Sequence, residues 1–217
     1  MKILLDTSVK RAQLGGFPNG FVTGQLITPL TGFSRWAKSF AIDNGAFSRF
    51  NKTGFASLLK REEASQETCL FVCCPDVVGS ARRTLEVFQR RHYFIPVSWK
   101  HALVAQDGIE DLDIPWHDFH CLFLGGRDPW KDSQAAQDVV KAAKLLGKHV
   151  HIGRVNTPDR YERYARLRAD TCDGSGVARY PDVKLPPLQE AFGRFQEYLA
   201  EIDRKIEELH KHEFETK

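Results

Sequence analysis

The chain has 217 residues and a formal net charge of +3 at pH 7. This length fits a single α/β barrel, a fold that runs to about 250 residues. The basic excess suits an anionic partner but is far below the extreme that indicates nucleic-acid binding on charge alone. No run of about 18 apolar residues is present, so we expect no membrane association and a soluble, cytoplasmic protein. The five cysteines lack paired spacing, so we expect reduced thiols.

Eight short runs of apolar, β-branched or aromatic residues recur along the chain and predict strands. They lie at residues 2–6, 21–28, 40–43, 69–74, 94–98, 121–124, 149–155 and 169–173. The glycine-containing segment 15–20 is typical of a loop rather than of a helix that crosses between strands. No low-complexity stretch or shift in composition marks a linker, so we expect one domain over residues 1–217.

Helical patterns follow several of these runs. The pattern at 80–88 follows the fourth run, and the pattern at 132–146 follows the sixth and stops at Gly147. A third pattern, at 158–167, follows the seventh run with Thr157 as its N-cap. Eight strands that alternate with helices predict an α/β fold, a parallel (β/α)₈ TIM-like barrel.

A charged segment after the last predicted strand carries a heptad stripe and predicts an extended C-terminal helix over residues 187–217. The stripe consists of Leu188, Phe192, Phe195, Leu199, Ile202, Ile206 and Leu209. One interpretation is the eighth barrel helix, lengthened and packed on the barrel wall. The other is that the distal half pairs with a second subunit, which makes a homodimer possible.

The third and eighth predicted strands end on Asp43 and Asp173, and a turn that contains glycine follows each aspartate. The carboxyl ends of barrel strands are where ligands bind. The histidine pairs, such as His149 and His151, are not at zinc spacing, so we expect no metal site. A pair of carboxylates is typical of glycosidic bond cleavage, whereas a single aspartate at a strand end is more often a turn or cap residue.

Five short motifs then occur in order along the chain. They lie at residues 73–79, 103–108, 122–126, 151–156 and 170–174. Together they resemble the DNA 7-deazaguanine transglycosylases, relatives of the tRNA-guanine transglycosylases, with the densest similarity over residues 40–176. The resemblance implies a barrel glycosyltransferase that exchanges guanine in DNA for a 7-deazaguanine base such as preQ0, without a cofactor, in a bacterial or phage-infected cell.

The resemblance also implies a role for each matching residue. Asp173 matches the nucleophile, and Asp43 matches the acid/base that moves protons. The base-binding residues are expected to be Asp76, Gln106, Gly125, Gly126, Asn44 and Phe47. Physical chemistry agrees, because a carboxylate can accept from the N1–H and amino groups of guanine, while Gln106 and the glycine N–H groups can donate to its O6. Asn44 and Ala46 stand where relatives often show serine and glycine.

Basic residues that follow the predicted strands could contact phosphates on either side of an extruded nucleotide. Those expected to bind nucleic acid are Arg49, Arg127, Lys131, Arg154 and Arg179. The alternative is an ordinary solvated surface. No cysteine follows Cys172, so the late zinc site of the tRNA enzymes is absent, which favours DNA. Three alternative functions remain open: a base-excising N-glycosidase, a tRNA-guanine transglycosylase and a non-catalytic barrel that binds a modified base.

Overall fold

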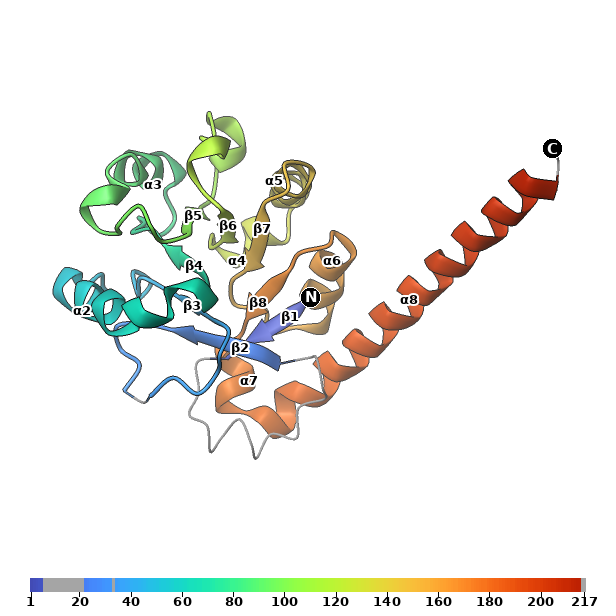
Figure 1. Ribbon diagram of the computed structural model, residues 1–217, viewed down its shortest axis with the longest axis horizontal. Helices are drawn as coiled ribbons and strands as arrows, with labels where there is room; N and C mark the ends of the chain where they lie inside the picture. Colours follow the sequence, from blue (N-terminus) through green and yellow to red (C-terminus); the bar gives the residue numbers. More distant parts are fainter. Residues whose placement is uncertain (6–21, 33, 216–217) are drawn as a thin grey trace.

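The protein is a closed barrel of parallel strands in sequence order, as the computed structural model shows for residues 1–5, 22–32 and 34–215 (Figure 1). The strands are β1 Lys2–Leu4, β2 Val22–Ile27, β3 Phe40–Ile42, β4 Cys69–Cys73, β5 His101–Ala105, β6 Cys121–Leu124, β7 His149–Ile152 and β8 Thr171–Asp173. Each strand pairs with the next, and β8 returns to β1 with Cys172 opposite Ile3. The predicted α/β barrel is confirmed. The loop expected at 15–20 lies outside the described residues.

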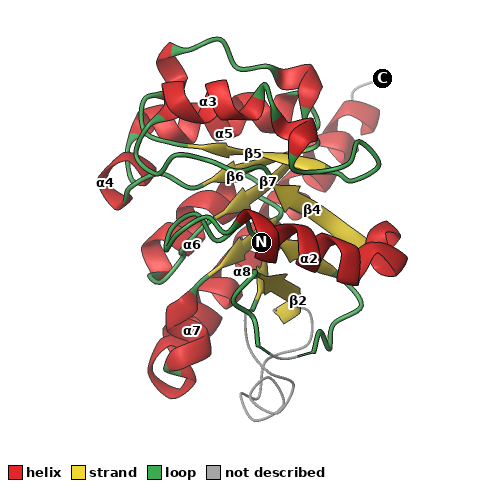
Figure 2. Ribbon diagram, turned by 90° about the vertical axis from the view of Figure 1, so that its left-hand side faces the viewer, coloured by secondary structure: helices red, strands yellow, loops and turns green. Residues whose placement is uncertain are grey.

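Helices surround the strands on the outside of the barrel (Figure 2). The α-helices are α2 Lys52–Glu62, α3 Ala81–Phe88, α4 Asp128–Lys131, α5 Gln134–Leu145, α6 Pro158–Arg166, α7 Ser175–Arg179 and α8 Pro181–Glu215. Short 3₁₀ helices lie at η1 Glu63–Thr68, η2 Arg91–Tyr93, η3 Ile109–Asp111 and η4 Trp116–Asp118. They belong to the connections between strands β3 and β6.

Helix caps explain where the predicted helices begin and end. The Thr157 side chain accepts a hydrogen bond from the backbone N–H of Arg160, so the expected N-cap of α6 is confirmed. The helix expected over 132–146 is α5, which begins at Gln134 because the Ser133 side chain accepts from the N–H of Ala136; the short helix α4 precedes it. Gly147 has a φ of +68°, a left-handed conformation that suits glycine, and it follows the end of α5.

The fifth strand is not at 94–98, where the sequence predicts it. That segment contains Pro96, which has no N–H for a strand ladder, and the carbonyl of Pro96 instead accepts a turn hydrogen bond from Trp99. Val97 is 75% exposed. The strand is β5, whose five residues are all buried, including His101 at its start. The polar residue His101 at the start of β5 hides its strand pattern in the sequence.

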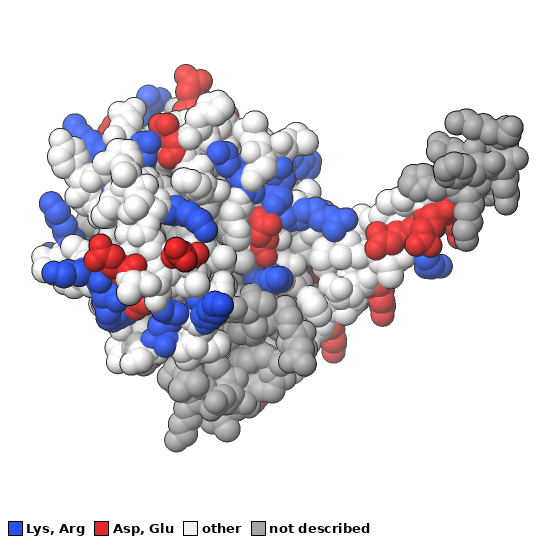
Figure 3. All heavy atoms as spheres, viewed as in Figure 1, with Lys and Arg blue, Asp and Glu red and all other residues white. Residues whose placement is uncertain are grey.

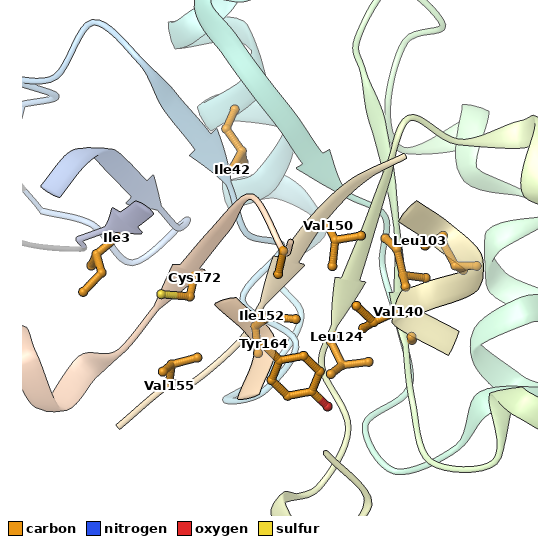
Figure 4. Packing of buried hydrophobic residues seen from close by; sticks show 14 of the residues in the cluster. Ile3, Ile42, Leu103, Leu124, Val140, Val150, Ile152, Val155, Tyr164 and Cys172 are labelled. Carbon is orange, nitrogen blue, oxygen red and sulfur yellow. The ribbon is translucent and has the colours of Figure 1, made fainter. Parts of the chain in front are cut away.

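The core has two layers because alternate strand residues point to opposite sides of the sheet. The inner layer fills the barrel with small and aromatic side chains, among them Ala102, Cys121 and Phe123. The outer layer lies between the strands and the helices, where Leu124 of β6 packs near Tyr164 of α6 (Figure 4). This packing makes the strands a rigid base for residues at their ends.

The C-terminal helix α8 begins at Pro181, before the expected start at residue 187. Its first half packs against α6, and Leu188 and Phe195 are buried there. Its second half extends away from the barrel (Figure 1), and Ile206 is 45% exposed. The barrel-wall interpretation of the stripe therefore holds for its first half.

No helix in the described ranges is long and apolar enough to cross a membrane. All five cysteines are buried free thiols.

Candidate active site

A cavity of about 360 Å³ lies at the carboxyl ends of the barrel strands. The residues of the predicted site that line it are Asp43, Asn44, Phe47, Asp76, Gln106, Gly125, Arg154, Asp173 and Arg179. They lie at or just after the ends of β3, β4, β5, β6, β7 and β8, so the closure of the barrel brings together residues that are far apart in the sequence. The volume falls within the range of small-molecule sites in proteins, about 300–1,000 Å³.

Asp173 ends β8, and its side chain is 18% exposed at the cavity. Its Oδ1 accepts hydrogen bonds from Nε2 of His151 and from the backbone N–H of Arg154, each at 3.1 Å. Among the residues that the structure describes, no donor reaches Oδ2. One oxygen is thus anchored by the protein, and the other can meet a ligand.

Asp43 follows β3 and also lines the cavity. Its Oδ1 accepts from the backbone N–H of Gly45 at 2.8 Å, which forms an Asx turn. Gly45 has a φ of +74°, a conformation that glycine adopts without steric cost. Asp43 is therefore both a turn residue and a carboxylate at the cavity, and the two interpretations are compatible.

Asp76 lies between two side-chain amides. Its Oδ1 accepts from Nδ2 of Asn44 at 2.8 Å, and its Oδ2 accepts from Nε2 of Gln106 at 2.7 Å. Burial raises the pKa of Asp76 above its usual range, and these two donors oppose the rise. The three residues form a rigid unit, here called the amide–carboxylate clamp, which spans the ends of β3, β4 and β5.

The two amides of the clamp are held in turn by backbone groups. Asn44 donates to the carbonyl of Cys74 at 2.7 Å and accepts from the N–H of Ala46 at 2.6 Å. The Oε1 of Gln106 accepts from the N–H of Gly79 at 2.9 Å. Asn44 thus donates both of its amide hydrogens, one to Cys74 and one to Asp76. Gln106 donates only one of its two amide hydrogens, so it keeps one N–H for a ligand. Asn44 therefore orients Asp76, and Gln106 can also touch a bound molecule.

Gly125 and Gly126 directly follow β6. Their N–H groups both donate to the carbonyl of Ala105, at 2.9 and 3.1 Å, so the backbone already engages them, and donation to a bound base stays a prediction. Their small size has another reason, because a Cβ at Gly125 would lie 2.6 Å from Val104 and one at Gly126 would lie 2.4 Å from Trp130. Of the two, Gly125 alone is among the cavity-lining residues.

Arg154 occupies the wall of the cavity with an unusual backbone. Its φ is +59°, a conformation that costs a non-glycine residue energy and that surrounding contacts must hold. Its Nη2 donates to the carbonyls of Gly125 and Gly126, at 3.2 and 2.7 Å. The guanidinium also lies over the ring of Phe47, with Cζ 4.7 Å from the centroid, and Phe47 is 68% exposed. The ring of Phe47 and the guanidinium of Arg154 thus stack on each other at the cavity.

The remaining basic residues of the predicted site divide into surface and interior. Arg49 and Arg179 are exposed, and Arg127 is 70% exposed while paired with Asp107 at 2.8 Å. Lys131 is fully buried and donates to the carbonyl of Gly153 at 2.7 Å, so it supports the loop after β7 and cannot reach a polymer. Burial lowers the pKa of Lys131 to about 8.

On one face of the described structure, no single basic patch is seen. On the face drawn in Figure 3, Lys and Arg side chains are spread over the barrel among Asp and Glu side chains. Arg179 is the exposed basic residue of the predicted set that also lines the cavity.

The site contains residues that the sequence does not single out for function. His151 of β7 is fully buried beneath Asp173, and its Nδ1 lies 2.9 Å from the hydroxyl of Thr171. That hydroxyl also lies 2.8 Å from Nε2 of His149. His149 and His151 are two residues apart on one strand, so their side chains lie on the same side of the sheet. This spacing is the signal in the sequence that could have indicated them. Within the described ranges, no three His, Cys, Asp or Glu side chains are grouped so as to hold a metal ion.

Comparisons with known proteins add little to this geometry. No protein-family model matches the chain, and no curated protein matches it. Solved structures that match include a cube-shaped, highly porous protein cage designed by fusing symmetric oligomeric domains. That chain is 11% identical, with 95% of this chain and 76% of the cage chain covered and a TM-score of 0.48. The fold therefore rests on the strand pairing described above, and the function rests on the site itself.

Proposed function

We propose that this protein is a transglycosylase, a pentosyltransferase that exchanges guanine in DNA for a 7-deazaguanine base such as preQ0. The observation that carries the proposal is that one cavity collects two carboxylates and the amide–carboxylate clamp. The carboxylates are Asp43 and Asp173, which suit a glycosidic reaction, and the clamp suits the hydrogen-bonding edge of a guanine. The motif resemblance supports the same assignment.

Asp173 is the proposed nucleophile. Its Oδ2 bonds to C1′ of the nucleoside as the bond from C1′ to N9 of guanine breaks, and the electron pair of that bond leaves with the base. Because Oδ1 already accepts from His151 and Arg154, the carboxylate is held with Oδ2 available for this step. In the second half of the reaction, N9 of the incoming base attacks C1′, and Asp173 leaves as a carboxylate.

Asp43 is the proposed proton carrier. A departing guanine is a poor leaving group as an anion, so a proton delivered by Asp43 lowers the barrier. The incoming base must lose a proton as it attacks, and Asp43 can take that proton back. The hydrogen bond from Gly45 fixes the carboxylate in the turn after β3, which keeps it at the cavity through both steps.

Base recognition is assigned to the clamp. An ionised carboxylate offers about four lone-pair positions, and the amides of Asn44 and Gln106 use two of them at Asp76. The other two can accept from the N1–H and amino groups that guanine and 7-deazaguanines share. The second amide N–H of Gln106 can donate to O6. Phe47 and Arg154 supply flat groups against which a base can stack.

The polymer is proposed to enter as DNA with one nucleotide extruded into the cavity. A base inside a duplex cannot reach carboxylates at a barrel mouth, so the nucleotide must leave the stack. Arg49, Arg127 and Arg179 are exposed and suit the flanking phosphates. Arg154 is reassigned from the phosphates to the base, because backbone carbonyls hold its guanidinium at the cavity wall.

The decisive experiment follows labelled guanine in duplex DNA, with and without preQ0, and with unmodified tRNA as competitor at matched salt. Loss of label that requires preQ0, with an intact backbone, is the expected result. Label loss without any incoming base would establish a base-excising N-glycosidase, and exchange into tRNA alone would establish a tRNA enzyme. Binding of a modified base with no chemistry on either polymer would establish a non-catalytic barrel.

A further inference from the structure

A line of hydrogen bonds runs through the barrel interior to the proposed nucleophile. From Nε2 of His149 it passes to the hydroxyl of Thr171, at 2.8 Å, and from that hydroxyl to Nδ1 of His151, at 2.9 Å. Nε2 of His151 then meets Oδ1 of Asp173 at 3.1 Å. His151 is 0% and Thr171 is 3% exposed. The strand register sets this line, because Thr171 of β8 lies opposite His151 of β7.

The number of hydrogens available gives this line a single direction when both imidazoles are neutral. An ionised Asp173 can only accept, so Nε2 of His151 carries the ring hydrogen. Nδ1 of His151 then has a lone pair and accepts the one hydroxyl hydrogen of Thr171. The hydroxyl oxygen accepts in turn from Nε2–H of His149. Each group thus donates toward the carboxylate.

Both imidazoles lie in an apolar layer. The ring of Phe123 stacks on His151 with centroids 4.6 Å apart, and Phe71 lies against both imidazoles at 5.1 and 5.6 Å. Burial also lowers the pKa of His149 to about 4, so this imidazole is neutral at neutral pH. In such an apolar layer an unsatisfied polar group is costly, whereas a complete chain of hydrogen bonds is strengthened by the low dielectric.

We propose that His151 is a positioning residue for Asp173, held in its Nε2–H tautomer by Thr171 and His149 so that Oδ1 is anchored and Oδ2 faces the cavity. The inference rests on the proposed function only for the role of Asp173 as nucleophile. If this polar cluster only stabilised the fold, any arrangement in which all of its groups are hydrogen-bonded would be sufficient. This one ends on the carboxylate that the reaction needs, and it anchors one oxygen only.

The first test reads the tautomer without any substrate. Protein labelled with ¹⁵N-histidine is examined by NMR at neutral pH, and the signals of His149 and His151 are assigned with His149→Gln and His151→Gln variants. The expected spectrum shows both rings neutral and both protonated at Nε2. A His151 ring that is cationic or protonated at Nδ1 would overturn the proposal, because the direction of the chain would then be different.

The second test removes one hydroxyl. Thr171→Val keeps the size and branching of the side chain but leaves Nδ1 of His151 without its donor, and Thr171→Ser restores the hydroxyl. The matched control is Thr84→Val, which removes another buried hydroxyl. Thr84 lies in α3, and its hydroxyl bonds the backbone N–H and carbonyl of Val77. In Thr171→Val, Nδ1 of His151 no longer accepts a hydrogen bond, so its ¹⁵N signal should move; in Thr171→Ser and Thr84→Val that signal should stay where it is in the wild type.

The same variants are then compared for the rate of covalent adduct formation with DNA in a single turnover. Thr171→Val should slow this rate by about tenfold or more, because a misplacement of about 1 Å can cost about 10²-fold. Base affinity should be unchanged, and Thr171→Ser should recover the rate. Equal rates in Thr171→Val and Thr84→Val would refute the positioning role. Absence of adduct in the wild-type protein would refute the proposed function instead, and the NMR result would still decide the tautomer.

Discussion

The two sides of the cavity hold their carboxylates in different ways. On the β3–β5 side, both oxygens of Asp76 accept from side-chain amides. On the β7–β8 side, both donors to Asp173 meet the same oxygen. A carboxylate fixed at both oxygens is suited to recognition, because its lone pairs have set directions. A carboxylate fixed at one oxygen can form a bond with the other while it stays in place.

The largest expected effect lies on the β7–β8 side. Asp173→Asn keeps the shape of the side chain but removes the nucleophilic oxygen, so we expect no covalent adduct and essentially no exchange. The measurement is a denaturing gel of protein incubated with labelled DNA. Asp138→Asn is the control, since Asp138 is an exposed carboxylate on α5 that pairs with Lys141. Adducts that persist in Asp173→Asn would place the nucleophile elsewhere.

Asp43→Asn should have the next largest effect. It removes a proton carrier, and such groups contribute about 10²–10⁴-fold to rate. DNA binding should be nearly unchanged, since the turn hydrogen bond from Gly45 can be accepted by an amide oxygen. The check is exchange rate beside DNA affinity on one preparation. Equal losses in both quantities would make Asp43 a structural residue and not a catalytic one.

On the β3–β5 side, the expected effect is on affinity. Asp76→Asn removes the charged acceptor, and a hydrogen bond to a charged group is worth about 1.5–3 kcal/mol, so binding of guanine or preQ0 should weaken at least about tenfold. Binding to the wild-type protein should also weaken as pH falls through the raised pKa of Asp76, because the protonated form loses acceptor capacity. Calorimetric titration of the free base measures both. Unchanged affinity would leave Asp76 as a turn residue.

Lys131 gives the smallest effect on activity but a distinct pH signature. Its folded pKa, about 8, is below the usual 10.5, so between these values the unfolded chain binds more protons and the contribution of Lys131 to stability rises with pH. The five buried cysteines, whose pKa values are raised, act in the opposite direction. The cysteines are the same in the wild type and in Lys131→Met. Their contribution therefore cancels in the difference between the two free energies of unfolding.

We therefore expect that difference to move in favour of the wild type as pH rises from 7.5 to 9.5, as measured by urea denaturation. Lys205→Met is the control, because Lys205 is an exposed lysine on α8 that pairs with Glu201. A pH-independent difference for Lys131→Met would mean that the buried ammonium is stabilised as well as it is in water. In that case Gly153 and Asp128 fully compensate its burial.

The sequence predicts most of the fold because its signals are local. Strand-like runs alternate with helical periods, and a cap such as Thr157 acts within a few residues of the helix that it begins. Asp43 and Asp173 were placed at strand ends for the same reason. The fifth strand was missed because its first residue, His101, is polar and yet buried, which a local pattern does not reveal.

The sequence alone therefore determined that strands and helices alternate, and that acids stand where parallel strands end. Only the tertiary structure decided what those residues touch. In the closed barrel, Thr171 lies beside His151, and the ammonium of Lys131 is buried. The N–H groups of Gly125 and Gly126 donate to the carbonyl of Ala105. The physical reason is that hydrogen-bond partners and burial depend on strand register and on loops distant in sequence, whereas propensity and capping depend on near neighbours.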